Sequence, residues 1–252
     1  MYNVNAMESK KSEAIILRTR DFGESDLIVT AFSNHYGNIK GIAKGARRSS
    51  KRFVNSLNIF SLVNLTFKEK SNRELVWVDS CDLVEGYPGI RSNYTVLSNA
   101  SYIVEITEIL FPANIQNIEL FNLLKFALGA LSDKQDPEKI LIIFQAQAMR
   151  MGGFGINLSK CNICGRSYKG KGRALFDPSA GSLTCMSCGK ETSLMPGLNP
   201  GSVQFLEMIQ SPEIPLTDKL HLKEDVLVEL KEALRLHVEH HLGRRLKSSK
   251  YI

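Results

Sequence analysis

Apolar and polar residues alternate in short runs over the first third of the chain, a pattern typical of β-strands. The expected strands are residues 14–19, 27–33, 38–44, 57–67 and 74–81, with a polar turn at 68–72. The fourth run carries apolar residues at a period of two: Leu57, Ile59, Val63, Leu65 and Phe67. Most of the connections are too short for a parallel crossover, so we expect a small antiparallel barrel. A five-stranded oligonucleotide-binding (OB) barrel is the first candidate, and an SH3-like barrel is the alternative.

From residue 92 onward the apolar period lengthens to that of an α-helix. The expected helices are residues 94–111, 118–131, 137–151, a short one from Asn199-Pro200 onward, and about 223–246. Pro112 should end the first helix, and Asp136 followed by Pro137 should open the third. Strands followed by helices predict an α+β fold with the barrel first.

Four cysteines form two close pairs, Cys161-x2-Cys164 and Cys185-x2-Cys188, with 20 residues between the pairs. A gap of two residues lets both thiolates of a tight turn face one ion, and the glycine after each pair permits the positive φ that such a turn often needs. Four sulfur ligands close a tetrahedral site, which predicts a structural zinc rather than a catalytic one. Iron is the alternative metal. Two disulfides are disfavoured, because nothing resembling a secretory signal precedes the cysteines.

The cysteine pairs interrupt the helical part of the sequence. We therefore expect three parts: an OB-fold domain at residues 1–85, a helical domain at 86–160 and 192–252, and a zinc-ribbon-like insertion at 161–191. The fifth cysteine, Cys81, ends an apolar strand and is expected to be a small core residue.

The composition is that of an ordinary globular protein, since 43% of the 252 residues are hydrophobic and 23% are charged. No apolar run approaches the ~20 residues that a membrane-spanning helix needs. The first seven residues lack the positive start and the apolar centre of a secretory signal. We expect them to form a loose tail, and we expect a cytoplasmic protein.

The net charge of +6 is unevenly distributed along the chain. The basic segment, residues 40–52, holds six cations and no acid: Lys40, Lys44, Arg47, Arg48, Lys51 and Arg52. Residues 160–190 hold six cations against Asp177 alone, and the last ten residues hold four more. Separate basic patches on an otherwise acidic chain favour binding of a polyanion, although each patch taken alone also suits solvated charge on a mobile loop.

The basic segment joins the expected third and fourth strands and is rich in glycine and serine, which predicts a loop. A flexible cationic loop on a small barrel can follow a phosphate backbone with little demand on base sequence. Tyr36 and Phe53 flank the segment, where they would either stack on bases or pack the barrel. The six cations are therefore our predicted contacts to a phosphate backbone.

Three other groups are better explained as structure than as sites. Residues 165–171 resemble a phosphate-binding loop, but Gly172 stands where that motif needs Ser or Thr. His237 and His241 have the spacing of a metal pair but lack the Glu of the protease motif. The acids at positions 21, 24 and 26 suit a turn better than a cation site. The sequence contains no convincing catalytic constellation, so we expect a protein that is not an enzyme.

Three stretches of the chain carry a resemblance to one bacterial family. They are EAIILRTRDFGESDLIVTAFSNHYGNIKGIAKGARRSSKRF near the start, GINLSKCNICG at the first cysteine pair, and HHLGRRLKSSKYI at the end. The chain resembles the RecO recombination mediators over nearly its whole length. The resemblance implies a barrel, a helical domain and an embedded zinc module.

The same resemblance implies a role in DNA repair, with binding of single- and double-stranded DNA and annealing of complementary strands. It also implies cooperation with RecR in loading RecA onto strands coated by single-strand-binding protein, contact with the acidic tail of that protein, and nucleoid association. The family's DNA contacts match the six cations of the basic segment as a cluster only. Some relatives lack the four cysteines, so the metal is expected to be scaffolding.

Two functions of other classes remain open at this point. One is a zinc-ribbon regulatory factor whose cysteine module itself binds nucleic acid. The other is a metal-dependent nuclease that uses the acids between Asp21 and Asp26. For the partner tail, an apolar groove with a basic rim is needed, and the basic end of the last helix is the candidate for one side of it.

Overall fold

A computed structural model describes residues 8–69, 75–111, 113–212 and 222–252 of the chain. The expected N-terminal tail, most of the turn at 68–72, the first residue of the fifth expected strand and the helix stop at position 112 lie outside the described residues. None of the described helices is both long and apolar enough to span a membrane.

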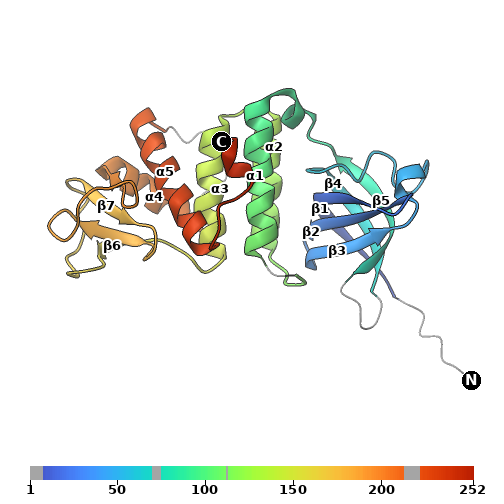
Figure 1. The fold of residues 1–252 in the computed structure, drawn as a ribbon, viewed down its shortest axis with the longest axis horizontal. Coiled ribbons are helices and arrows are strands. Elements are labelled where there is room, and N and C mark those ends of the chain that lie inside the picture. The colour runs from blue at the N-terminus through green and yellow to red at the C-terminus, as the bar shows by residue number, and fades with distance from the viewer. Residues whose placement is uncertain (1–7, 70–74, 112, 213–221) are drawn as a thin grey trace, which may run out of the picture. The chain divides into compact units, whose positions relative to one another are not determined.

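The N-terminal part is a closed barrel of five strands, which confirms the predicted five-stranded barrel and the α+β class (Figure 1). Its strands are β1 (Ser9–Phe22), β2 (Asp26–Ser33), β3 (Gly37–Ala43), β4 (Leu62–Lys68) and β5 (Val76–Glu85). They are ordered β1-β2-β3-β5-β4, and every neighbouring pair is antiparallel except β3 with β5. Alternate side chains fill the interior: Ile16, Val29, Ala31, Ile39, Val63, Leu65, Phe67 and Val78.

The expected fourth strand was wrong at its start, because β4 begins only at Leu62. Asn55 has a φ of 54° and Phe60 a φ of 77°, and this left-handed backbone cannot continue a pleated strand. Phe60 instead donates its backbone N–H to the carbonyl of Ile16 at 2.8 Å. Leu57 still reaches the barrel core, whereas Ile59 is 36% exposed. The apolar alternation before Leu62 therefore reflects packing of a folded loop.

Five α-helices lie within the described residues, where the sequence places them: α1 (Tyr94–Leu110), α2 (Ile118–Ser132), α3 (Pro137–Met151), α4 (Pro200–Gln210) and α5 (Glu224–His241). Asp136 caps α3 by accepting hydrogen bonds from the N–H groups of Glu138 and Lys139, and Asn199 caps α4. Helix α5 is shorter than expected, since Gly243 has a φ of 63° just beyond its end.

Residue contacts divide the chain into two compact units. The first joins Met1–Ile90 with Val104–Gly129, and the second joins Arg91–Ile103 with Ala130–Ile252. The barrel belongs to the first unit and the cysteine segment to the second. The division into the three parts 1–85, 86–160 with 192–252, and 161–191 stays a prediction.

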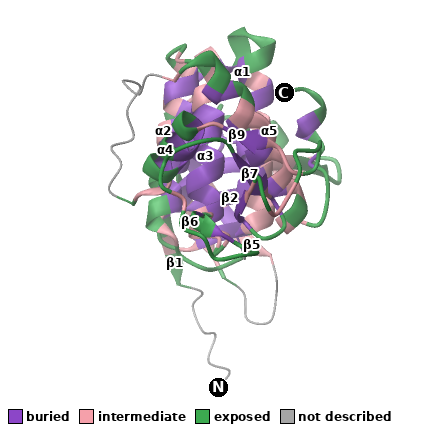
Figure 2. Ribbon diagram, turned by 90° about the vertical axis from the view of Figure 1, so that its left-hand side faces the viewer, coloured by how far each residue is buried: buried purple, intermediate pink, exposed green. Residues whose placement is uncertain are grey.

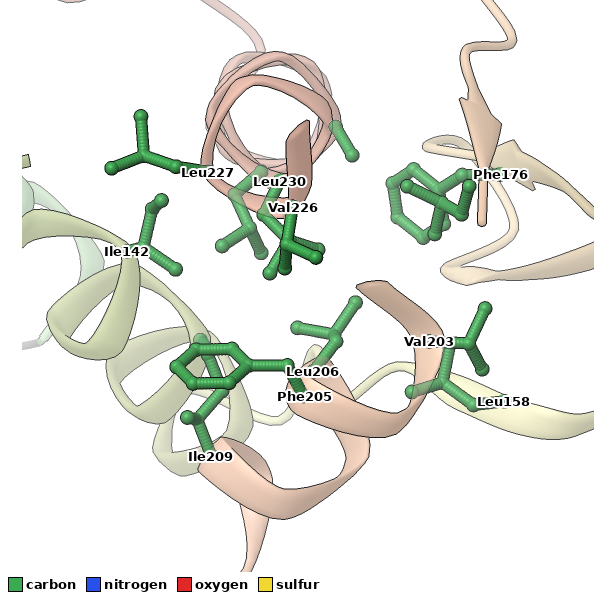
Figure 3. Packing of buried hydrophobic residues seen from close by; sticks show 14 of the residues in the cluster. Ile142, Leu158, Phe176, Val203, Phe205, Leu206, Ile209, Val226, Leu227 and Leu230 are labelled. Atoms are coloured by element: carbon green, nitrogen blue, oxygen red, sulfur yellow. The ribbon is translucent and has the colours of Figure 1, made fainter. Parts of the chain in front are cut away.

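The second unit builds one hydrophobic core from helices and a small sheet. Strands β6 (Asn157–Cys161), β7 (Ala174–Asp177), β8 (Ser182–Cys185) and β9 (Gly197–Leu198) are ordered β6-β8-β7-β9. Helix α3 is buried throughout residues 140–149 (Figure 2). Side chains of α3, α4 and α5 meet Leu158 of β6 and Phe176 of β7 (Figure 3). The cysteine segment therefore shares its core with the helices.

Two left-handed glycines of the barrel unit give a matched test of its packing. Gly37 has a φ of 64°, and a Cβ there would overlap the backbone carbonyl of Ile115, whereas Gly23 has a φ of 62° and open space around it. We expect Gly23→Ala to lower the free energy of unfolding by about 1 kcal/mol, from backbone strain alone. Gly37→Ala adds a backbone overlap and should cost several times more. Urea unfolding of both variants measures the difference, and equal losses would contradict this packing.

Candidate metal centre and nucleic-acid interface

The four cysteine sulfurs gather at one point in the second unit. The Sγ atoms of Cys161, Cys164, Cys185 and Cys188 all lie within 4.8 Å of one another. Strands β6 and β8 are parallel neighbours and end at Cys161 and Cys185, so each strand delivers one cysteine pair to the same edge of the sheet. Among the described residues this is the single cluster of metal-ligating side chains found.

The two cysteine turns use their glycines differently. Gly165 donates its N–H to the carbonyl of Cys161 at 3.0 Å and has a φ of 71°, as predicted. Gly189 makes the matching bond to Cys185 at 3.1 Å but does not have the expected positive φ. A Cβ at Gly189 would lie 2.9 Å from the Leu175 side chain. Glycine is needed there for lack of space rather than for backbone conformation.

The thiols are arranged for an ion rather than for independent titration. Backbone N–H groups of Cys164 and Cys185 lower the pKa of Cys161 to about 6, and the Cys185 N–H lies 3.3 Å from the Cys161 sulfur. Hydrogen bonding to the sulfur of Cys185 raises the pKa of Cys188 to about 12. Cys161 and Cys188 therefore do not titrate independently of each other, because each shift comes from hydrogen bonds within the cluster.

The sulfur spacing fits a tetrahedral metal ion. A metal–sulfur distance of about 2.3 Å in a tetrahedron places sulfurs about 3.8 Å apart. The sulfurs of Cys164 and Cys185 are 3.8 Å apart. The cluster could therefore hold a metal ion with all four positions taken by protein, which suits a structural centre.

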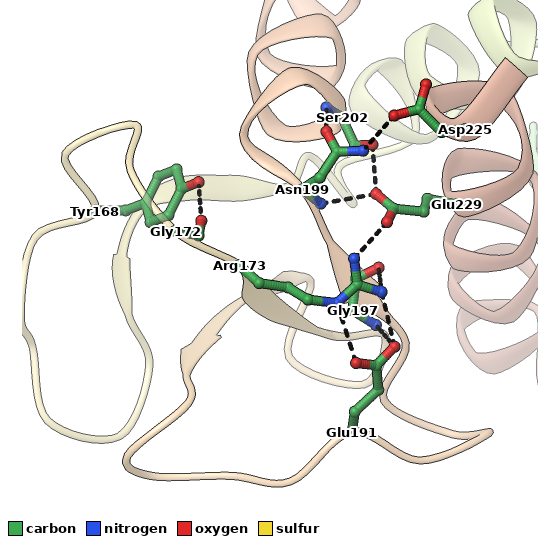
Figure 4. A network of polar contacts seen from close by, with 9 residues as sticks. All are labelled: Tyr168, Gly172, Arg173, Glu191, Gly197, Asn199, Ser202, Asp225 and Glu229. Carbon is green, nitrogen blue, oxygen red and sulfur yellow. Dashed lines mark hydrogen bonds and ion pairs between the residues drawn. The ribbon is translucent and has the colours of Figure 1, made fainter. Parts of the chain in front are cut away.

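An ion network ties the cysteine segment to the helices (Figure 4). Arg173, at the start of β7, pairs with Glu191 at 2.8 Å and with Glu229 of α5 at 2.6 Å. Both hydrogen bonds raise the pKa of the Arg173 guanidinium. Glu229 also accepts from the Asn199 N–H at 2.7 Å and the Ser202 hydroxyl at 2.6 Å, so one carboxylate joins β7, the cap of α4 and α5.

Two arginines of the basic segment hold the loop in place. Arg52 donates to the carbonyl of Lys44 at 2.8 Å and to that of Asp79 on β5 at 3.2 Å. Arg47 lies 3.5 Å from the carboxylate of Asp21. These contacts attach the segment to the neighbouring strands: Asp21 offsets the charge of Arg47, and the carbonyls occupy N–H donors of Arg52.

The remaining loop cations face outward. Arg48 and Lys51 are exposed and, in the described part of the chain, have no acidic partner. The Lys44 amine lies 4.2 Å from the centre of the Trp77 ring on β5. Sequence reasoning missed Trp77 as a neighbour of the basic segment, because β3 and β5 are paired only through the barrel closure.

Lys40 lies apart from the other five cations, on the outer wall of the barrel. It pairs in register with Thr30 of β2, which pairs in turn with Arg18 of β1. The three side chains and Arg20 border a hollow of about 120 Å³. Glu108 of α1 lines the same hollow and forms an ion pair with Arg18 at 2.5 Å. The barrel wall thus adds Arg20 to the predicted set, because Glu108 already neutralises Arg18.

Arg18 and Arg20 were missed because their neighbourhood depends on strand register. Alternation along β1 places both on one face, but only the pairing with β2 and β3 brings Lys40 beside them. Of the two aromatic residues proposed to stack or pack, Phe53 is 5% exposed in the barrel core. Tyr36 packs edge-on against Phe67, with ring centres 5.3 Å apart. Both serve packing.

The groups interpreted above as structural have structural contacts. Asp26 accepts the N–H of Gly45 at 2.8 Å, and this bond lowers the pKa of its carboxyl. His237 is fully buried, with its ring nitrogens 3.0 Å and 2.8 Å from the carbonyls of Pro178 and Phe154. Cys81 is a buried core residue, and its burial raises the thiol pKa to about 12.

Comparison with known proteins covers nearly the whole chain. Residues 7–87 match the family described as "Recombination protein O N terminal", and residues 91–250 match "Recombination protein O C terminal". The DNA repair protein RecO of Syntrophobacter fumaroxidans is 35% identical over 98% of this chain and 98% of its own. The proteins of the same name from Syntrophus aciditrophicus and Anaeromyxobacter dehalogenans are 30% and 31% identical, over 99% and 98% of this chain and 97% and 96% of their own.

The sulfur cluster predicts how metal content responds to cysteine substitution. Cys161→Ser removes one of the four sulfur ligands and the acceptor of three backbone N–H groups, so the purified protein should lose its metal and the segment should become sensitive to protease. Cys81→Ser is the matched control, since this buried cysteine is not part of the cluster. Elemental analysis checks both variants. Full metal content in Cys161→Ser would show that the cluster is not the binding site.

Proposed function

The chain belongs to the RecO family of recombination proteins, and on that premise we propose that it is a DNA repair protein that anneals complementary strands and is not an enzyme. It would bind single- and double-stranded DNA. With RecR it would help load RecA onto strands coated by single-strand-binding protein, working in the cytoplasm at the nucleoid. Family membership supports the repair role directly. The surface of the barrel unit supports the DNA contact.

The observation that carries the proposal is a pair of uncompensated cations on an anchored loop. Arg48 and Lys51 are exposed and have no acid partner among the described residues, while Arg52 fixes the loop that carries them. If the role of Arg48 and Lys51 were to stabilise the barrel, salt bridges would neutralise their charges. An anchored loop with open charge is suited to a phosphate backbone, because the ligand meets charges that are already in place.

The mechanism follows from electrostatics. Two complementary strands repel each other through their phosphates, and counterions condense along each strand. A protein that places Lys and Arg beside the phosphates releases these counterions and lowers the repulsion, without breaking a bond. Lys40 with Arg20 would extend the contact from the loop onto the barrel wall. Phosphate contacts of this kind are insensitive to base sequence, as annealing of any pair of strands requires.

We further propose that the metal is zinc and that its role is scaffolding. Cys161, Cys164, Cys185 and Cys188 would hold it, as their sulfur spacing allows. Zinc bound by four thiolates has no open position, so it would supply no reaction chemistry. It would instead join the ends of β6 and β8.

The acidic tail of single-strand-binding protein is the proposed peptide partner. A site for it needs cations beside an apolar surface. The residues after α5 supply four cations, Arg244, Arg245, Lys247 and Lys250. Arg245 donates to the Ser249 hydroxyl at 3.2 Å and lies 3.8 Å from Glu239. Arg244 and Lys250 are the candidates for the rim of the site.

The loop cations predict the salt dependence of DNA binding. Each phosphate contact on a single strand contributes about −0.7 to the slope of log affinity against log salt. Arg48→Ala with Lys51→Ala should therefore make the slope shallower by about 1.4. Titration of a labelled oligonucleotide at several salt concentrations measures this slope.

The matched control removes two cations near the start of β1, outside the basic segment. Lys10→Ala with Lys11→Ala changes the net charge equally, and Lys10 is already paired with Glu69 at 2.7 Å. The control should keep the slope of the unaltered protein. If both double variants shift the slope equally, net charge rather than the loop governs binding, and the proposed contact is wrong.

A further inference from the structure

A second cationic hollow lies beside the cysteine cluster, in the compact unit that does not contain the barrel. It has a volume of about 290 Å³ and is bordered by Cys161 and Cys185, one residue of each cysteine pair, and by the loop between β6 and β7. Four cations line it: Arg166, Lys169, Lys171 and Arg173. No acid is among its described lining residues.

Only one of these four cations is neutralised by the protein. Arg173 is held between Glu191 and Glu229. Arg166, Lys169 and Lys171 are exposed and have no acidic partner in the described part of the chain. Three like charges around one hollow repel each other, and no carboxylate among the described lining residues offsets this repulsion. An anionic ligand would offset it.

The lining favours phosphate over an acidic peptide with apolar side chains. The apolar residues Ala174 and Leu183 border the hollow, but they are 2% and 1% exposed and belong to the core. A peptide anchor would need an open apolar slot, which these residues do not provide. Met186, which is 50% exposed, leaves one flexible apolar side chain that suits the face of a base or sugar.

We propose that this hollow binds the phosphate backbone of single-stranded nucleic acid through Arg166, Lys169 and Lys171. The inference rests on the proposed function and deepens it, because it gives the chain a second polyanion site in its second compact unit. One molecule would then hold a strand on each unit. Annealing needs two strands held at once, and a single basic loop contacts only one.

A competing role for the same cations is to offset the charge of the metal centre. Four thiolates around a dication carry a net charge of −2, and nearby cations would stabilise it. This role and the proposed one differ in what the cations affect. Charge compensation requires metal affinity to fall when they are removed, whereas a nucleic-acid site requires DNA binding to fall with metal content unchanged.

The test compares two triple variants of the full chain. Arg166→Gln, Lys169→Gln and Lys171→Gln remove the hollow's cations, while Lys160→Gln, Lys190→Gln and Lys223→Gln remove exposed cations of the same unit that do not line it. With labelled oligo(dT), the first variant should have a slope of log affinity against log salt that is shallower by about 2, at about 0.7 per contact. The control should keep its slope, and both should keep their metal.

Several outcomes would overturn the inference. They are an unchanged slope in the first variant, loss of its metal, or loss of affinity for an acidic peptide in place of oligo(dT). A charge-retaining variant, Arg166→Lys with Lys169→Arg and Lys171→Arg, should keep the slope, which excludes misfolding as the cause. If the hollow variant keeps its salt slope while the Arg48 and Lys51 variant shows its expected shallower slope, the proposed function is retained and only this inference is wrong. If neither variant changes the salt slope, the proposed function is wrong as well.

Discussion

The contact on which the barrel's cationic surface depends is the pair of hydrogen bonds from the Arg52 guanidinium to the carbonyls of Lys44 and Asp79. Arg52 also accepts the backbone N–H of Cys81 at 2.9 Å, so main chain and side chain both attach it to β5. Guanidinium is always charged and its planar fork loses little freedom on binding two acceptors. The loop cations repel one another, and these bonds keep the loop on the barrel in spite of that repulsion.

The cysteine segment has the same arrangement built from other parts. Arg173 is its anchoring arginine, held by Glu191 and Glu229, and the sulfur cluster closes its two turns. Beside this anchor stand cations that no described acid neutralises, as Arg48 and Lys51 stand beside Arg52. In both units a paired arginine stabilises a segment, and its unpaired neighbours leave charge open to the solvent. The proposed binding of polyanions would use this division between anchoring and open cations.

Local patterns predicted the parts of the fold that local interactions determine. Asp136 and Asn199 cap the helices that they were expected to open, because a cap involves only the next three residues. The spacing within each cysteine pair is local in the same way, whereas the pairing of β6 with β8 brings the two pairs together. The sequence did not predict the features that depend on strand register. The row from Arg18 through Thr30 to Lys40 crosses three strands. Phe60 has a left-handed backbone conformation, which interrupts an apolar alternation that the sequence carries on into β4.

The most direct measurement of the central idea is the annealing rate of two complementary strands coated with single-strand-binding protein, in the presence of the full chain and without ATP. We expect a rate well above that of the coated strands alone at low salt. The rate should fall steeply as salt rises, and both strands should keep their full length. No acceleration at low salt, or an acceleration that salt does not weaken, would show that open cations are not what brings the strands together.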